Sequence, residues 1–183
     1  MRYDGSIGLV TREGNTAPGV SGTFTAFGDP VINGYGEVAF VAKLALSPTV
    51  TAENNQGIWT DLGGSLKLVC REGTAPAGMA SGYTFKTFQW FNLSDDLLYV
   101  GAQTTNGTTT LSGVWKYDGT TFSKVCAQGD SMLLSGSTRV IKSIINPTGS
   151  QTGNAQSRVA SSSGRLVLEV SSSNGYEQYV TFP

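Results

Sequence analysis

The stretch LVTREGNTAPG, residues 9–19, decides how this chain is organised, because it occurs again as LVCREGTAPAG at residues 68–78. A weaker third copy, KVCAQGDSMLLSG, occupies residues 124–136 and carries Ala127 where the second copy has Arg71. Copies that recur at a spacing of about 60 residues are the signature of a repeat architecture. We therefore predict one domain, 1–183, made of three repeats that span residues 2–60, 61–116 and 117–182.

The segments between these copies recur as well. The matching pairs are VINGYGEVAFVA at 31–42 with FNLSDDLLYVGA at 91–102, and GIWTDLGGSLKLVC at 57–70 with GVWKYDGTTFSKVC at 113–126. In the second pair, Trp59 and Trp115 hold the same position of a hairpin. We expect both indole rings to be buried equivalents of each other.

Apolar residues alternate with their neighbours, as in EVAFVAKL at 37–44, and this period of two predicts β-strands. The chain also contains 24 glycines, spread along its length, which predict frequent turns. Asp-Gly pairs at Asp4-Gly5 and Asp118-Gly119 predict tight hairpins, because both central turn positions need positive φ. We expect an all-β fold with four strands in each repeat, near 6–12, 23–27, 37–44 and 56–60 in the first repeat.

Asn33, Gly36, Ala39 and Phe40 fit the pattern N-x-x-G-x-x-A-F. Together with the REG…APG turns, they make the chain resemble the bacterial tandem-repeat proteins named for that motif. The resemblance extends over essentially the whole chain. It implies an exported, surface-attached protein with β-propeller-like blades, and it carries over no catalytic residues. The later copies depart from the motif: the second keeps Asn92 but has Asp95, Leu98 and Tyr99, and the third keeps Gly164 with Leu168 in place of phenylalanine.

Three four-stranded repeats leave two closed arrangements open. Propellers have about four to eight blades, so three blades would need others from a second chain or from a longer parent. A β-trefoil-like three-fold would instead close within one chain.

The chain ends read as complementary halves of one hairpin. RYDGSIGLV at 2–10 matches the second half of KYDGTTFSKV at 116–125, and YEQYVTF at 176–182 stands where the first half belongs. Unpaired strand edges attract other strands, so we predict that 2–12 and 176–182 pair within one chain or between two copies. The expected partner is the chain itself, or neighbouring repeats of a longer parent.

The composition excludes several functional classes. With 12 Lys+Arg against 13 Asp+Glu, the chain offers no general attraction for nucleic acid. No stretch reaches the roughly 20 apolar residues of a membrane helix, so no membrane insertion is predicted. Histidine is absent, which excludes Ser-His-Asp and Cys-His catalysis and histidine-containing zinc sites. We predict no catalytic residue, no cofactor and no metal.

Two sets of residues are candidates for ligand contact. FQWFN places Phe88 and Trp90 near a turn, and Trp90 has no tryptophan counterpart in the other repeats. Arg12 and Arg71 begin recurrent Arg-Glu pairs that could line a channel and hold a ligand. The alternative is structural in both cases: core burial for the aromatic residues, and local hydrogen bonds within its own turn for each Arg-Glu pair.

Two further pairs of residues are interpreted as structural. Asp95 and Asp96 are adjacent, and neighbours on a strand point to opposite faces, so they predict a turn entering a strand. Cys70 and Cys126 hold the same position in successive copies. Such positions usually lie beyond the roughly 7 Å that a disulfide allows between Cα atoms, so we expect two buried thiols.

These observations favour a non-enzymatic, extracellular or cell-surface β-repeat module that binds, displays or assembles with copies of itself. Two alternatives stay open at this point. The chain could be a carbohydrate-binding or carbohydrate-cleaving domain that uses surface aromatics and carboxylates. A phage or virion structural protein would also fit the low-charge composition.

Overall fold

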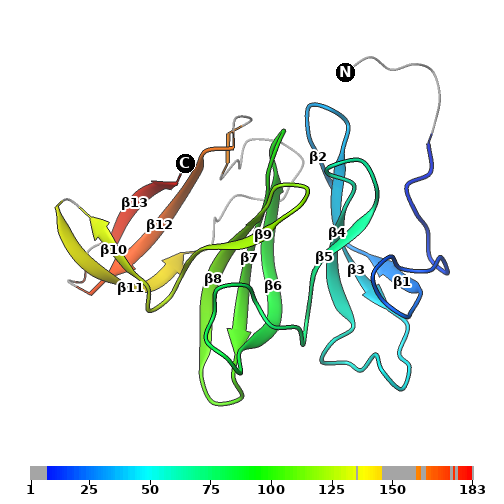
Figure 1. Cartoon of the computed structure of the whole chain (residues 1–183), viewed down its shortest axis with the longest axis horizontal. Helices are drawn as coiled ribbons and strands as arrows, with labels where there is room; N and C mark the ends of the chain where they lie inside the picture. Colours follow the sequence, from blue (N-terminus) through cyan, green and yellow to red (C-terminus); the bar gives the residue numbers. More distant parts are fainter. Residues whose placement is uncertain are drawn as a thin grey trace.

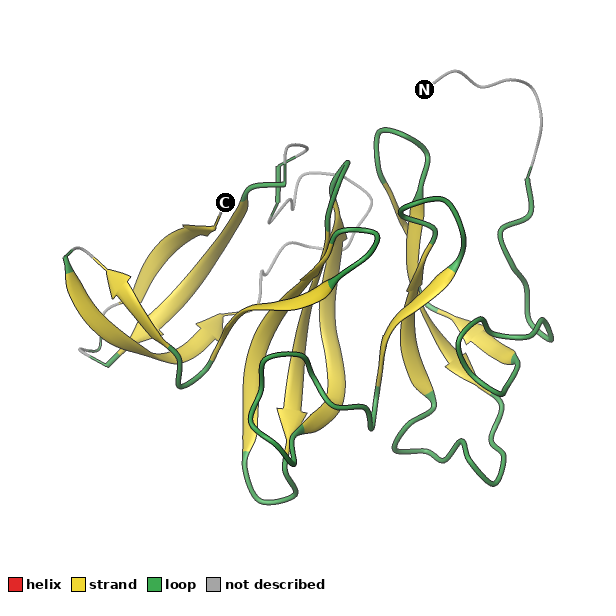
Figure 2. Cartoon of the chain, viewed as in Figure 1, coloured by secondary structure: helices red, strands yellow, loops and turns green. Residues whose placement is uncertain are grey.

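The computed structural model of the protein describes residues 8–134, 136–145, 160–161, 164–173, 175 and 177–182. Every regular element of these residues is a β-strand, and Figure 2 shows strands joined by loops without a helix in the described part of the chain. The predicted all-β class is therefore confirmed. The strands are β1 (Phe24–Phe27), β2 (Val31–Ile32), β3 (Val38–Leu44), β4 (Gln56–Thr60), β5 (Lys67–Arg71), β6 (Thr84–Leu93), β7 (Leu98–Thr105), β8 (Thr110–Tyr117), β9 (Phe122–Ala127), β10 (Ser131–Leu134), β11 (Ser137–Ile145), β12 (Leu166–Ser172) and β13 (Glu177–Phe182).

The strands form three antiparallel sheets. Sheet 1 has the order β1-β3-β4-β5, with β2 also paired to β3; sheet 2 has the order β6-β7-β8-β9, and sheet 3 the order β10-β11-β12-β13. Figure 1 shows the sheets in a row that follows the sequence, with sheet 2 between the other two. Each strand therefore pairs mainly with its neighbours in the chain, and the sheets contact one another through their faces.

Alternation along the strands supplies the faces that pack. β12 buries Leu166, Leu168 and Val170, whereas Val167 between them is 41% exposed. Because successive side chains point to opposite faces of a sheet, one face of sheet 3 is apolar and packs against sheet 2. The core between sheets 2 and 3 contains Tyr99, Val114, Cys126, Ile141, Ile144, Ala160, Leu166, Leu168 and Val170.

Two further apolar clusters involve sheet 1. The core between sheets 1 and 2 contains Ala39, Ile58, Leu62, Cys70, Phe85, Leu93, Leu98, Val100, Ala102, Trp115 and Tyr117. The other face of sheet 1 carries Phe24, Phe40, Ala42, Leu44 and Trp59, and it packs against a loop rather than a sheet. That loop contributes the buried Ala17, and the Pro18 carbonyl accepts a hydrogen bond from Trp59 Nε1 (3.0 Å).

One turn occurs in front of each sheet with the same hydrogen bonds. Gly14 N–H donates to the Phe24 carbonyl (2.8 Å), Gly73 N–H to Phe85 (2.9 Å) and Gly129 N–H to Ile141 (2.8 Å). The three glycines have φ of 83°, 76° and 94°, in the left-handed region that favours glycine. The geometry that the three turns share explains why the sequence has a glycine at this place in front of each sheet.

The predicted strand at 6–12 is not formed by its described residues, since Gly8–Arg12 lie in no strand. The two segments that match it in sequence are β5 and β9, and each pairs with the strand before it, β4 or β8. Gly8–Arg12 have no such preceding strand among the described residues, so their backbone lacks a neighbour to pair with. Residues 2–7, which include the predicted hairpin Asp4-Gly5, lie outside the described part. The other predicted hairpin is confirmed: Gly119 joins β8 to β9 with φ 88°.

The predicted pairing of the two chain ends is not formed within the chain by the described residues. Sheet 3 ends at β13, which pairs with β12 alone. In Figure 1 the dark blue segment after residue 8 lies beyond sheet 1, at the other end of the row from the red β13. Pairing between two copies stays a prediction.

Candidate functional site

The structure does not bring the four predicted ligand-contact residues together. Phe88 packs in the core between sheets 1 and 2, with its ring centroid 5.6 Å from that of Phe85. Trp90 packs against the core between sheets 2 and 3. Arg12 begins the turn in front of sheet 1, and Arg71 ends β5 and leads into the turn in front of sheet 2. The four side chains therefore do not form one ligand site.

Trp90 is a packing residue whose neighbour makes room for it. A Cβ atom added to Gly101 would lie 2.2 Å from the Trp90 ring, so the indole occupies the space above a residue without a side chain. Its Nε1 is buried and has no hydrogen-bond partner among the described residues. The structural interpretation of Trp90 therefore explains its position. The sequence already indicated space for the Trp90 ring, because β7 has Gly101 where β3 has Val41.

The arginines hold equivalent places in their turns. The Arg12 carbonyl accepts from Asn15 N–H (3.2 Å), and the Arg71 carbonyl accepts from Thr74 N–H (3.2 Å). Arg12 Nε reaches the Asn15 side chain at 3.4 Å, whereas Arg71 Nε is buried without a partner in the described structure. The two backbone carbonyls therefore hold equivalent turns, and the side chains differ in their surroundings.

Asn33 is the centre of a buried polar network that joins sheet 1 to sheet 2. Its Nδ2 donates to Glu37 Oε2 (2.7 Å) within its own turn, and to the carbonyls of Ser94 (3.2 Å) and Asp95 (3.3 Å) in front of β7. Its Oδ1 accepts from the N–H groups of Tyr35 and Glu37, both at 3.0 Å. The first residue of the N-x-x-G-x-x-A-F motif therefore fixes both its own turn and the neighbouring sheet.

The carboxylates around Asn33 bind backbone groups. Glu37 Oε1 accepts from Gly63 N–H (3.2 Å). Asp61 Oδ1 accepts from Val38 N–H (2.6 Å), and Asp95 Oδ1 accepts from Gly34 N–H (3.0 Å). These acids hold turns in place, and no group of three or more His, Cys, Asp or Glu side chains suited to a metal occurs among the described residues.

Replacing Asn33 with alanine is expected to lower the free energy of unfolding by about 2–3 kcal/mol. The change leaves buried carbonyl and N–H groups of two turns without their partner, and such groups keep their desolvation cost. Urea titration of the variant measures the loss. Tyr35→Ala is the control, since this side chain is 74% exposed and should change stability by less than about 0.5 kcal/mol. A similar small change for Asn33→Ala would contradict the bridging role.

The two cysteines are free and buried, as predicted. Cys70 lies in the core between sheets 1 and 2, and Cys126 in the core between sheets 2 and 3. Burial raises the pKa of the Cys70 thiol well above its usual value. Burial, with a smaller contribution from Asp130, raises the pKa of Cys126 to about 12. The folded protein thus keeps these protons at pH values where the unfolded chain loses them, so its stability falls as the pH rises above 9.

Neither thiol is expected to react with a disulfide reagent in the folded protein at pH 8. The thiolate is the reactive species, and burial suppresses both its formation and its access to the reagent. Counting released chromophore in buffer should give near zero, and in concentrated denaturant it should give both thiols. Rapid reaction of one thiol in buffer would contradict its burial.

Exposed apolar residues lie at the two ends of the row of sheets. Tyr179 of β13 is 77% exposed and Val167 of β12 is 41% exposed, on the face of sheet 3 that points away from sheet 2. Leu9 and Val10 of the N-terminal segment are 72% and 48% exposed. Sequence analysis missed Tyr179 and Val167, although their alternation with Leu168 and Val180 marked them as one face. These surfaces are the candidate sites of interaction.

Comparison with protein-family models gives a match over almost the whole chain. A family model with the description "Family of unknown function (DUF7453)" matches residues 1–181. No curated protein and no solved structure matches the chain. A search of the described residues for a helix long and apolar enough to cross a membrane found none.

Proposed function

The chain belongs to the DUF7453 family of unknown function, and we propose that it is a non-enzymatic β-repeat module of the cell surface or extracellular space that assembles with copies of itself. We further propose that its sheets are propeller-type blades, repeated three times. The low charge and the resemblance to surface-attached tandem-repeat proteins support the location. The geometry of the sheets and of their edges supports the assembly.

The register of the three hairpins supports repeated blades. Trp59 pairs with Phe40 in sheet 1, and Trp115 pairs with Val100 in sheet 2. In sheet 3, Val180 pairs with Leu168 at the corresponding place. The shared turns in front of the sheets add a second set of equivalent positions.

The observation that carries the proposal is that sheet 3 lacks, within the described chain, a strand equivalent to β5 and β9. β5 and β9 each complete a sheet by pairing with the strand before them, and Gly8–Arg12 match them in sequence. Gly8–Arg12 lie in no strand, and β13 pairs with β12 alone within the described chain. A second copy can therefore supply residues 8–12 to the free edge of β13, as β5 does to β4.

The equivalence with β5 predicts which N–H groups of residues 8–12 would point toward β13. Glu72 N–H donates to the Gln56 carbonyl (2.9 Å), and N–H groups alternate between the two edges of a strand. The N–H of Cys70 therefore points toward β4, and that of Arg71 points away from it. Thr11 and Arg12 occupy the same places in the N-terminal copy.

Wild-type protein is expected to have a molar mass above the 19.2 kDa of one chain, measured by light scattering after gel filtration. Thr11→Pro should shift the protein toward monomer, because proline removes the N–H that would donate to β13. Arg12→Pro is the matched control and should leave the mass unchanged, since its N–H would point outward. A wild-type monomer at every accessible concentration would contradict self-assembly.

A further inference from the structure

We propose that the outer face of sheet 3 docks onto the outer face of sheet 1 of a second copy, so that the chains associate head to tail. The inference rests on the proposed self-assembly and names the surfaces that form it. The tail face consists of Val167, Glu169, Ser171, Tyr179 and Thr181. The head face consists of Phe27, Val38 and Leu66, beneath which Phe40 and Trp59 are buried.

Tyr179 stands at a register position that the other sheets bury. Ile58 precedes Trp59 in β4, Val114 precedes Trp115 in β8, and Tyr179 precedes Val180 in β13. Ile58 and Val114 are 0% exposed because the next sheet covers them, whereas Tyr179 is 77% exposed. A large aromatic side chain is thus left open where its equivalents contact a neighbouring sheet.

The same holds for Val167 on the neighbouring strand. It precedes Leu168, as Ala39 precedes Phe40 and Tyr99 precedes Val100. Ala39 and Tyr99 are 0% exposed, and Val167 is 41% exposed. Two adjacent strands therefore present apolar residues at positions that lie between sheets elsewhere in the chain.

The head face of sheet 1 resembles the face of sheet 2 that packs on sheet 1, because both carry the same types of residue at matching positions. Sheet 2 packs on sheet 1 through a face that includes Phe88, Phe122 and Trp115. At the matching positions sheet 1 has Phe27, Leu66 and, beneath them, Trp59.

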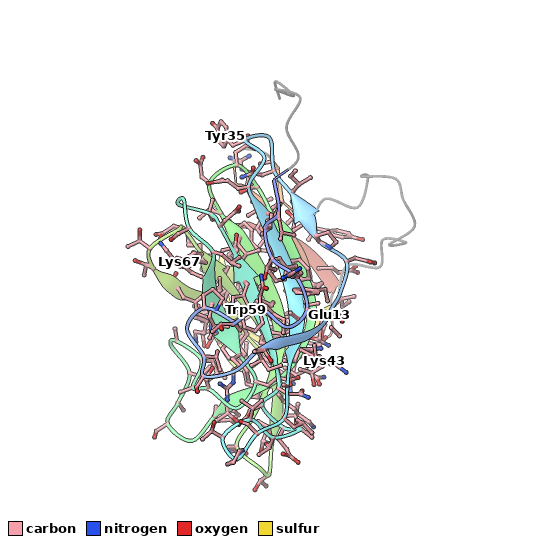
Figure 3. All side chains as sticks on the ribbon, turned by 90° about the vertical axis from the view of Figure 1, so that its right-hand side faces the viewer. Glu13, Tyr35, Lys43, Trp59 and Lys67 are labelled. Carbon is pink, nitrogen blue, oxygen red and sulfur yellow. The ribbon has the colours of Figure 1, made fainter. Side chains whose placement is uncertain are left out.

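Phe27 is 37% exposed, and Val38 and Leu66 are half-buried. Figure 3 looks onto this end of the molecule, with Trp59 labelled near its centre. The head face therefore presents apolar side chains at the positions through which sheet 2 packs on sheet 1.

A second copy of the chain would both pair with the edge of β13 and cover the tail face. Within the chain, β5 completes sheet 1 and then leads through the turn at Arg71–Thr74 into sheet 2, which covers sheet 1. If residues 8–12 of a second copy complete sheet 3 beside β13, the following turn leads into sheet 1 of that copy. Sheet 1 of the second copy then covers the tail face by the same route.

Head-to-tail contacts are heterologous, so they either close into a ring or continue as a filament. Two copies would place six sheets in one ring, within the range of about four to eight blades of propellers. We therefore infer a closed pair, with twice the 19.2 kDa mass of one chain.

Tyr179→Glu tests the tail face. The side chain is exposed in the single chain, so the fold should be retained, and circular dichroism with thermal unfolding verifies this. We expect the dissociation constant of the pair, measured by sedimentation, to rise at least tenfold. Tyr35→Glu is the matched control, because Tyr35 is 74% exposed but belongs to a turn outside both faces, and its dissociation constant should not change.

A mixing experiment tests the head-to-tail geometry. Leu66→Glu on the head face should also weaken the pair, with Phe27→Gln as the second variant if the first fails to fold. A mixed pair of Tyr179→Glu and Leu66→Glu chains keeps one interface with both wild-type faces. Mixing the two variants should therefore restore association, whereas a symmetric contact of like faces would give no such restoration.

The outcomes separate the two proposals. If wild-type protein and Tyr179→Glu associate equally well while Thr11→Pro does not, the face contact is overturned and self-assembly through the edge stands. Variants that fail to restore each other on mixing also overturn the head-to-tail contact. A wild-type monomer overturns self-assembly itself.

Discussion

Trp115→Ala is expected to lower the free energy of unfolding by about 3–5 kcal/mol, as large-to-small changes in a core do. The Trp115 side chain is 0% exposed, and its ring makes an edge contact with Phe85 at a centroid distance of 5.0 Å. The substitution also removes the hydrogen bond from Nε1 to the Ala77 carbonyl (2.9 Å). Without this hydrogen bond, the loop between sheets 1 and 2 would lose one of its contacts with sheet 2.

Urea titration followed by circular dichroism measures this effect. Trp115→Phe separates the contributions, since it keeps an aromatic ring but not the Nε1 donor, and it should cost less than the alanine change. Trp59→Ala should behave similarly, because Trp59 is also 0% exposed and bonds Pro18 in the same way. A loss below about 1 kcal/mol for Trp115→Ala would remove the equivalence of the two hairpins.

Gly101→Val is expected to cost about 3 kcal/mol, at the upper end of the range for overpacked cores. Any Cβ at this position would lie 2.2 Å from the Trp90 ring, which packs against the core between sheets 2 and 3. The backbone itself gives no reason for glycine, since Gly101 lies within β7 and valine is a good strand former. The expected loss therefore arises from the contact alone.

A double-mutant cycle tests that contact. In a Trp90→Ala background the space above residue 101 is empty, so Gly101→Val should cost much less than it does alone. Thermal or urea unfolding of the four proteins gives the coupling free energy. Additive losses would show that the indole and the glycine do not depend on each other.

Local pattern determined the parts of this fold that depend on neighbours in the chain. The alternation of apolar residues predicted the strands, because a sheet with one buried face requires a period of two. Asp118-Gly119 predicted a hairpin, because the backbone there needs positive φ. The recurrence of Trp59 at the place of Trp115 predicted two buried rings, because the same local geometry surrounds both.

Tertiary structure decided what depends on distant partners. Gly8–Arg12 match β5 in sequence, yet they form no strand, because a strand needs a neighbour for its N–H and C=O groups. The sequence placed Trp90 only near a turn, and the tertiary structure shows that its ring packs above Gly101. Asp95 was predicted only to enter a strand, but its carboxylate holds Gly34 of another sheet (3.0 Å).

The exposed face of sheet 3 shows the same division. Tyr179 and Ile58 hold the same register position in β13 and β4, each directly before the residue that pairs with Leu168 or Phe40. Only the order of the sheets decides that sheet 2 covers Ile58 and that the described chain has no sheet to cover Tyr179. A strand pattern determines which side chains share a face, whereas burial requires a second surface, and the position of that surface is a property of the tertiary structure.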